Sequence, residues 1–143
     1  TKERLEAFCA DNHLEGRVVF MGTSSALEKD IANAGVFVLP SDYEGMPNAL
    51  IEAMALGIPC IATDCPCGGP AMLMKQFGGI LVPPGKEAEL ADAMRRVLSD
   101  PPSADEMGDQ ARSVRKWVHP QHIYDQWKAY VESLIGGEVG NQL

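Results

Sequence analysis

Short apolar runs alternate with amphipathic stretches along this sequence, and this alternation constrains the fold more than any other feature. Each run is only a few residues long, and segments of helical length separate the runs. A strand that is apolar throughout is typical of a parallel sheet whose two faces are both covered. The repeated order of strand and helix therefore predicts an α/β fold, in which helices sandwich a parallel sheet.

The expected elements follow from this pattern and from its glycines and prolines. Strands are expected over residues 18–20, 36–39, 60–62 and 79–82. Helices are expected over residues 2–12, 27–34, 47–56, 69–77, 87–99, 103–118 and 123–135. Pro47 at the first position and Gly57 after the last are typical helix bounds. We expect one domain over residues 1–136 and a flexible tail over residues 137–143.

The carboxyl ends of the strands are the expected location of a binding site. Parallel connections are right-handed, so these ends all lie at one edge of the sheet. In open sheets of this kind, ligands bind just outside that edge. The loops to consider are residues 21–26, 40–47 and 63–70, and all three are rich in small and polar residues.

Residues 41–57 give the strongest indication of a site. This segment leaves a buried strand and leads directly into a helix, so its turn presents free N–H groups at a helix N-terminus. Such a terminus attracts phosphate or carboxylate, and Gly45 permits a close approach to the backbone. Pro47 has no N–H. The amides that remain for a ligand are those of Gly45, Met46, Asn48 and Ala49.

Two glutamates flank this terminus, Glu44 in the turn and Glu52 in the helix. The neighbours of Glu52 are apolar, so it is either a hydrogen-bonded carboxylate in a buried helix or part of a narrow solvent stripe. The helical rise from Pro47 to Glu52 is roughly 7.5 Å, too far for the carboxylates to share a proton. They would act as acid and base around a water, as in inverting glycosidases, or contact different hydroxyls of an extended ligand. The terminus between them favours the second arrangement, with a diphosphate in the middle.

The spacing of Glu44 and Glu52 resembles the E-x7-E motif of the family 4 (group 1) retaining glycosyltransferases of GT-B fold. Four further segments fit the family pattern in order: Arg17–Gly22, Ala34–Ser41, Glu52–Pro59 and Gly79–Pro83. The resemblance runs from about Leu5 to about Ile135. It implies the C-terminal, donor-binding half of a GT-B enzyme, a Rossmann-like domain that lacks its first strands.

The resemblance also implies a nucleotide-sugar site and a role for each residue in it. Glu44 would be the catalytic residue that contacts hydroxyls of the donor sugar, and Glu52 would bind the ribose. The sugar and diphosphate would be held by the amides of Gly45, Met46 and Asn48, and the base would lie against Met21 and Gly22. Transfer would retain the anomeric configuration, by front-face attack that the leaving diphosphate assists. No metal or other cofactor is expected.

Two features of the family have no match in this sequence. Family members carry an upstream Arg and Lys that clamp the diphosphate, and an N-terminal domain that binds the acceptor. We therefore expect this chain to be inactive by itself. Its expected partners are the nucleotide sugar and the acceptor domain of a parent chain, which would be cytoplasmic or peripheral at the inner face of the membrane. The net charge of −8 argues against a nucleic-acid partner.

The loop over residues 63–70 indicates a donor class. It resembles the Asp-Cys-Pro-x-Gly-Pro variant of members that build bacterial surface polysaccharides, many of which use UDP-sugars. The expected function is transfer of a hexose or N-acetylhexosamine from a UDP-sugar to a glycan or lipid-linked acceptor in that biosynthesis. A non-catalytic nucleotide-binding or scaffold module and a glycosidase are the alternatives. Cys65 and Cys67 are interpreted as shaping the loop, because zinc sites need four ligands.

The C-terminal part of the sequence offers weaker signals. Arg112, Arg115 and Lys116 form a basic cluster that we interpret as a solvated helix face rather than a membrane contact. In the family, the last helix packs onto the N-terminal domain. Trp127 and Tyr130 on that helix are therefore expected to be exposed.

Overall fold

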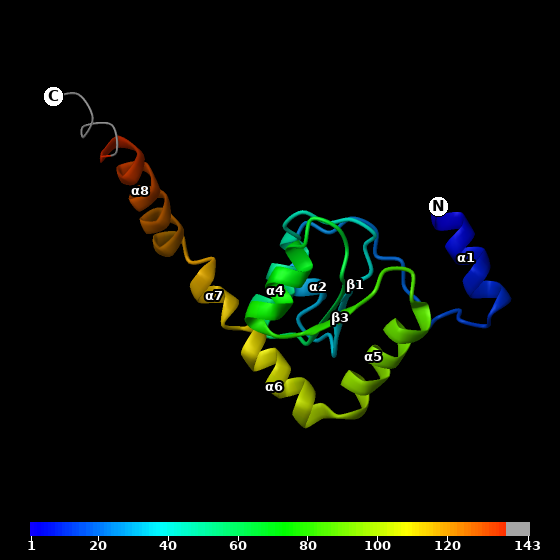
Figure 1. Ribbon diagram of the computed structural model, residues 1–143. Coiled ribbons are helices and arrows are strands. Elements are labelled where there is room, and N and C mark those ends of the chain that lie inside the picture. Colours follow the sequence, from blue (N-terminus) through cyan, green and yellow to red (C-terminus); the bar gives the residue numbers. More distant parts are fainter. Residues whose placement is uncertain (137–143) are drawn as a thin grey trace.

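A computed structural model describes residues 1–136, and Figure 1 shows them as a small sheet flanked by helices. The strands β1 (Phe37–Leu39), β2 (Cys60–Thr63) and β3 (Ile80–Val82) form one parallel sheet in the order β1-β2-β3. Val38 is in register with Ile61, which is in register with Ile80. The predicted parallel α/β fold is confirmed.

Helices cover both faces of this sheet. The side chains of β2 alternate between the two faces, so the strand contributes to the packing on each of them. Cys60 and Ala62 pack into one core, with residues of α3 (Asn48–Leu56) and α4 (Gly69–Phe77). Ile61 packs into a second core, with residues of α5 (Glu87–Ser99) and α6 (Pro101–Ala111). The central strand therefore joins two separate hydrophobic cores.

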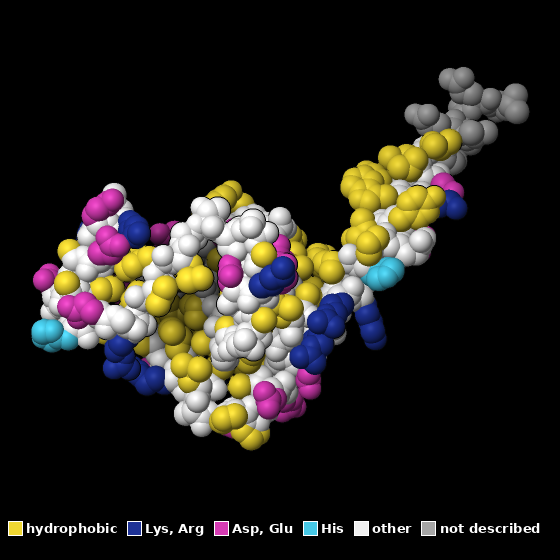
Figure 2. Space-filling view, turned by 180° about the vertical axis from the view of Figure 1, so that it is seen from behind, with side chains coloured by type: hydrophobic (Ala, Val, Ile, Leu, Met, Phe, Trp, Pro, Cys, Tyr) yellow, Lys and Arg dark blue, Asp and Glu magenta, His cyan; other side chains and the backbone are white. Residues whose placement is uncertain are grey.

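The remaining helices lie around this unit. They are α1 (Lys2–Asp11), α2 (Leu27–Asp30), α7 (Val114–Trp117) and α8 (Pro120–Gly136). In Figure 1, α8 projects away from the sheet on the side opposite α1. Figure 2 shows hydrophobic side chains gathered along α8, and Trp127 and Tyr130 are 63% and 57% exposed. None of the helices within residues 1–136 has the length and apolar character that a bilayer crossing requires.

Several expected elements differ in the structure. The strand over residues 18–20 does not form, and Val19 is 71% exposed. No strand within the described residues offers this segment a partner, and an apolar run becomes a strand only by pairing. The helix expected over residues 27–34 ends at Asp30, ahead of Asn33 and Gly35, which both have low helix propensity.

Several helix bounds were also predicted incorrectly. Pro47 is the N-cap of α3 rather than its first residue, since its backbone is extended and its carbonyl accepts from the amides of Leu50 and Ile51. The helix expected over residues 103–118 is two helices, because the Ser113 hydroxyl donates to the Gln110 carbonyl, 2.7 Å away, and competes with the helical ladder. Prolines begin α6 and α8 instead of separating them from their neighbours. The predicted tail, residues 137–143, lies outside the described residues.

Candidate donor-binding site

The loops after β1 and β2 meet at the carboxyl edge of the sheet. In the structure, Gly69 begins α4, and a Cβ atom placed on it would lie 1.6 Å from the carbonyl oxygen of Gly45. The backbone of the first loop therefore rests directly on the first turn of α4. A cavity at the same edge is lined by residues from the ends of all three strands: Pro40, Thr63 and Val82, with Asp42, Lys86 and Glu87 around them.

Glu44 is held in this loop by a short chain of hydrogen bonds. The Ser41 hydroxyl donates to Oε1 of Glu44 over 2.7 Å. The hydroxyl of Thr63, at the end of β2, donates to the carbonyl of Ser41. Thr63 is buried and Glu44 is half-buried. The carboxylate is therefore connected through the loop to the central strand.

The N-terminus of α3 opens next to Glu44. The Pro47 carbonyl accepts from Leu50 and Ile51. Among residues 1–136, no hydrogen-bond acceptor pairs with the backbone amides of Gly45, Met46, Asn48 and Ala49. These are the amides that the sequence singled out. An anion at this position would complete their hydrogen bonding and complement the helix dipole.

Glu52 lies on an exposed side of α3, one turn after Asn48, which is also exposed. This decides between the two interpretations of Glu52 in favour of the solvent-facing one. The Glu52 carboxylate is therefore accessible to a ligand, and its ionised form is not penalised by burial. Glu44, the free amides and Glu52 follow one another from the loop into the second turn of the helix.

Met21 and Gly22 stand apart from this cluster. They lie in the segment that does not join the sheet, and Met21 is 68% exposed. Within the part of the chain that the structure describes, no hydrogen bond connects them to residues 41–52. The structure thus brings the residues of the E-x7-E segment together, but in the described part of the chain no hydrogen bond joins residues 21–22 to them.

A contact between Tyr43 and Cys67 was missed by the sequence analysis. The Cys67 thiol and the Tyr43 hydroxyl are in hydrogen-bond contact over 2.9 Å, at the outer side of the two loops. This contact raises the pKa of Tyr43, because the phenol donates its proton to the sulfur once the thiol has ionised. Cys65, in contrast, is buried. The two residues of the contact are 24 positions apart, and the one signal in the sequence is that both their loops follow parallel strands.

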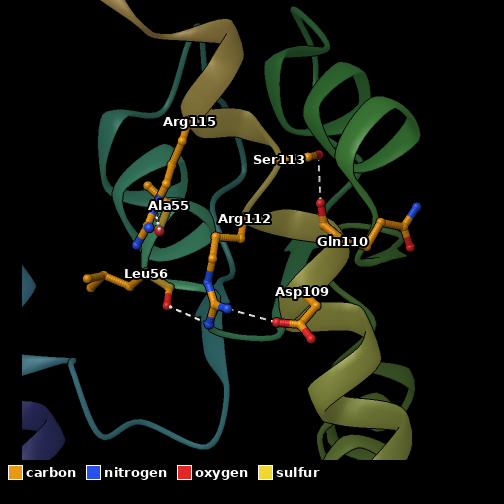
Figure 3. A network of polar contacts seen from close by, with 7 residues as sticks. All are labelled: Ala55, Leu56, Asp109, Gln110, Arg112, Ser113 and Arg115. Carbon is orange, nitrogen blue, oxygen red and sulfur yellow. Dashed lines mark hydrogen bonds and ion pairs between the residues drawn. The ribbon is translucent and has the colours of Figure 1, made fainter.

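The opposite end of α3 is occupied by arginines from the C-terminal part of the chain (Figure 3). Nε of Arg115 donates to the carbonyl of Ala55 over 2.5 Å, and Nη2 of Arg112 lies 3.4 Å from the carbonyl of Leu56. Cations at a helix C-terminus complement the helix dipole. The two arginines are exposed, as expected, but they are not simply a solvated face.

Comparison with known proteins places this geometry in a family. The family model for Glycosyl transferases group 1 matches residues 1–114. The chain belongs to this family. A curated relative, the lipopolysaccharide 1,6-galactosyltransferase of Salmonella typhimurium, is 35% identical over 101 residues, which cover 68% of this chain and 28% of that protein.

Two solved glycosyltransferase structures resemble the whole described unit. A sucrose-phosphate synthase from Thermosynechococcus elongatus aligns with a TM-score of 0.80 and 32% identity, over 94% of this chain and 34% of its own. A TarM variant from S. aureus, in complex with fondaparinux, α-GlcNAc-glycerol and UDP, aligns with a TM-score of 0.77 and 25% identity, over 90% and 26%. Both neighbours are GT-B enzymes. The chain thus spans about a third or less of the length of these three proteins.

Proposed function

We propose that this chain is the donor-binding part of a retaining glycosyltransferase that uses a UDP-linked hexose or N-acetylhexosamine. The observation that carries the proposal is the order of groups along the loop after β1 and the helix α3. Glu52, the free amides and Glu44 follow one another, as ribose, diphosphate and sugar do in a nucleotide sugar. The acceptor would be a glycan or lipid-linked glycan of bacterial polysaccharide biosynthesis.

Each group has a distinct role in this proposal. Glu52 accepts from ribose hydroxyls, and the amides of Gly45, Met46, Asn48 and Ala49 bind the diphosphate and sugar. Glu44 accepts from a sugar hydroxyl, and residues 21–22 lie against the base. Negative charge grows on the diphosphate as the glycosidic bond breaks. Amides fixed at a helix N-terminus stabilise that charge without having to reorient, which is the largest contribution that this chain makes to transfer.

Two of the compared proteins support the donor class. The Salmonella relative is named as a galactosyltransferase of lipopolysaccharide, and the TarM variant is in complex with UDP and a GlcNAc-glycerol. The loop over residues 63–70, which resembles that of UDP-sugar users, points in the same direction. Two parts of the proposal rest on the resemblance to family 4. They are that transfer retains the anomeric configuration and that it needs no metal.

The proposal is tested by ligand-observed NMR on the 143-residue chain with UDP, UDP-GalNAc, UDP-glucose and GDP-mannose. UDP compounds should bind, and GDP-mannose should bind at least tenfold more weakly. Glu52→Ala should remove a hydrogen bond from a charged group to the ribose, which weakens binding by about tenfold or more. Glu106→Ala, an exposed glutamate on α6, is the matched control and should bind as the wild type does.

Binding of none of the UDP compounds to the folded chain would contradict the proposal, and so would a Glu52→Ala variant with unchanged affinity. Transfer itself is assayed in a longer polypeptide that contains both this chain and an acceptor-binding domain. The anomeric coupling constant of the product then reports retention or inversion.

A further inference from the structure

Glu44 occupies a loop, so helix or strand geometry does not fix its side chain. A glutamate has three rotatable bonds, and ordering a long side chain costs conformational entropy. In this structure, however, the Ser41 hydroxyl donates to Oε1 of Glu44 over 2.7 Å. We infer that Ser41 is a positioning residue for the Glu44 carboxylate, and that Thr63 in turn fixes Ser41. The inference rests on the proposed function, in which Glu44 contacts the donor sugar.

The geometry assigns different tasks to the two carboxylate oxygens. A carboxylate accepts through both oxygens, with about four lone-pair sites in total. Ser41 uses Oε1, and no other hydrogen bond or ion pair to Glu44 is present among residues 1–136. Oε2 is therefore left for a sugar hydroxyl. Ser41 selects one orientation of the carboxylate and keeps its second oxygen available.

Thr63 provides the fixed point of this arrangement. It is the last residue of the central strand and is 5% exposed. Its hydroxyl has one proton, and the Ser41 carbonyl is a closer acceptor than the Leu39 carbonyl at 3.4 Å. Ser41, the second residue of the loop, is thus tied to β2. Because the Gly45 carbonyl also rests on Gly69, the loop is supported on both sides of Glu44.

This role predicts an effect on the sugar part of the donor alone. Ser41→Ala should weaken UDP-GalNAc binding by up to about tenfold, because the released Glu44 side chain must then be ordered when the sugar binds. The affinity for UDP, which lacks the transferred sugar that contacts Glu44, should change by less than about twofold. Ser41→Thr retains the hydroxyl and should restore most of the UDP-GalNAc affinity. Thr63→Val should lower the same affinity, and Thr63→Ser should retain it.

The experiment is a double-mutant cycle on the dissociation constants of UDP and UDP-GalNAc. Wild type, Ser41→Ala, Glu44→Ala and the double variant are each titrated with both ligands. The ratio of the two constants is the readout, because a partly unfolded sample weakens both affinities by the same factor. Ser41→Ala should change this ratio in the wild-type background and leave it unchanged in the Glu44→Ala background.

The outcomes separate the two levels of the proposal. A wild-type chain that binds no UDP-sugar overturns the proposed function, and this inference with it. If wild type binds and Glu44→Ala changes the ratio but Ser41→Ala does not, the inference alone is wrong. The inference is also wrong if Ser41→Ala weakens both ligands equally, or if its effect on the ratio persists without Glu44.

Discussion

Gly69→Ala is the most informative single test of how the two loops are packed. The added Cβ atom would lie 1.6 Å from the carbonyl oxygen of Gly45 and 2.8 Å from its carbonyl carbon. Both of these are backbone atoms, so no side-chain rotation relieves the overlap. The loop and the first turn of α4 must separate by roughly 2 Å before the contact becomes an ordinary one.

Two opposing effects set the size of the change. Alanine in place of glycine stabilises a helical position by about 1 kcal/mol, mainly by restricting the unfolded chain. Overpacking costs about 1–3 kcal/mol, and the upper end applies where only backbone can move. We therefore expect the free energy of unfolding to fall by about 2 kcal/mol. Because the displaced segment carries Glu44, affinity for UDP-GalNAc should fall as well.

The assay is urea unfolding followed by far-ultraviolet circular dichroism, with the slope m checked for constancy. Gly45→Ala is the matched control, since its Cβ atom would meet nothing within 4 Å. The control should unfold within about 0.5 kcal/mol of the wild type. A Gly69→Ala variant that is as stable as the wild type, or more stable, would refute the close contact between the two loops.

Three further predictions concern other parts of the chain. Burial raises the pKa of the Cys60 thiol to about 12. The stabilisation that Cys60 provides is therefore complete below the unfolded thiol's pKa of about 8.5. It falls by up to about 1.4 kcal/mol per pH unit as pH rises toward 12. In urea titrations, the difference in unfolding free energy between wild type and Cys60→Ala should shrink as pH rises through this window, and a constant difference would contradict the assignment. Arg115→Met should lower the free energy of unfolding by about 1 kcal/mol, because the hydrogen bond to the Ala55 carbonyl is lost. The control Arg95→Met, which breaks an exposed ion pair, should lower it by less than about 0.5 kcal/mol. Equal losses would argue against the contact between Arg115 and Ala55. Amides of α8, whose side chains over residues 120–135 are exposed, should exchange with deuterium much faster than those of α3, and equal protection of the two helices would show that α8 is packed in solution.

Elements with clear local signals were predicted well from the sequence. The predicted bounds of α4 and α5, residues 69–77 and 87–99, are those of the structure. Glycines and prolines mark the ends of these segments, and an apolar stripe marks the buried side of each helix. The same local signals located the four free amides at the start of α3, because a helix end leaves its first N–H groups unpaired wherever it occurs.

Features that depend on distant residues were not predictable in this way. The run over residues 18–20 has the composition of a strand, but composition does not reveal whether a pairing partner exists. The bond from Thr63 to Ser41 spans 22 positions, and the one from Cys67 to Tyr43 spans 24. Neither pair has a recognisable spacing. The sequence thus located Glu44 but not the residues that orient it.

The arginines at the carbonyl end of α3 have a mechanical consequence. Of the other elements, α8 packs chiefly against α7, and α7 packs against α3. Arg115, in α7, and Arg112, just before it, hold the last turn of α3, whose first turn carries the free amides. A load applied to the projecting α8 is therefore transmitted through α7 to α3. The proposed diphosphate site and the exposed α8 are thus linked through two consecutive contacts, between α3 and α7 and between α7 and α8.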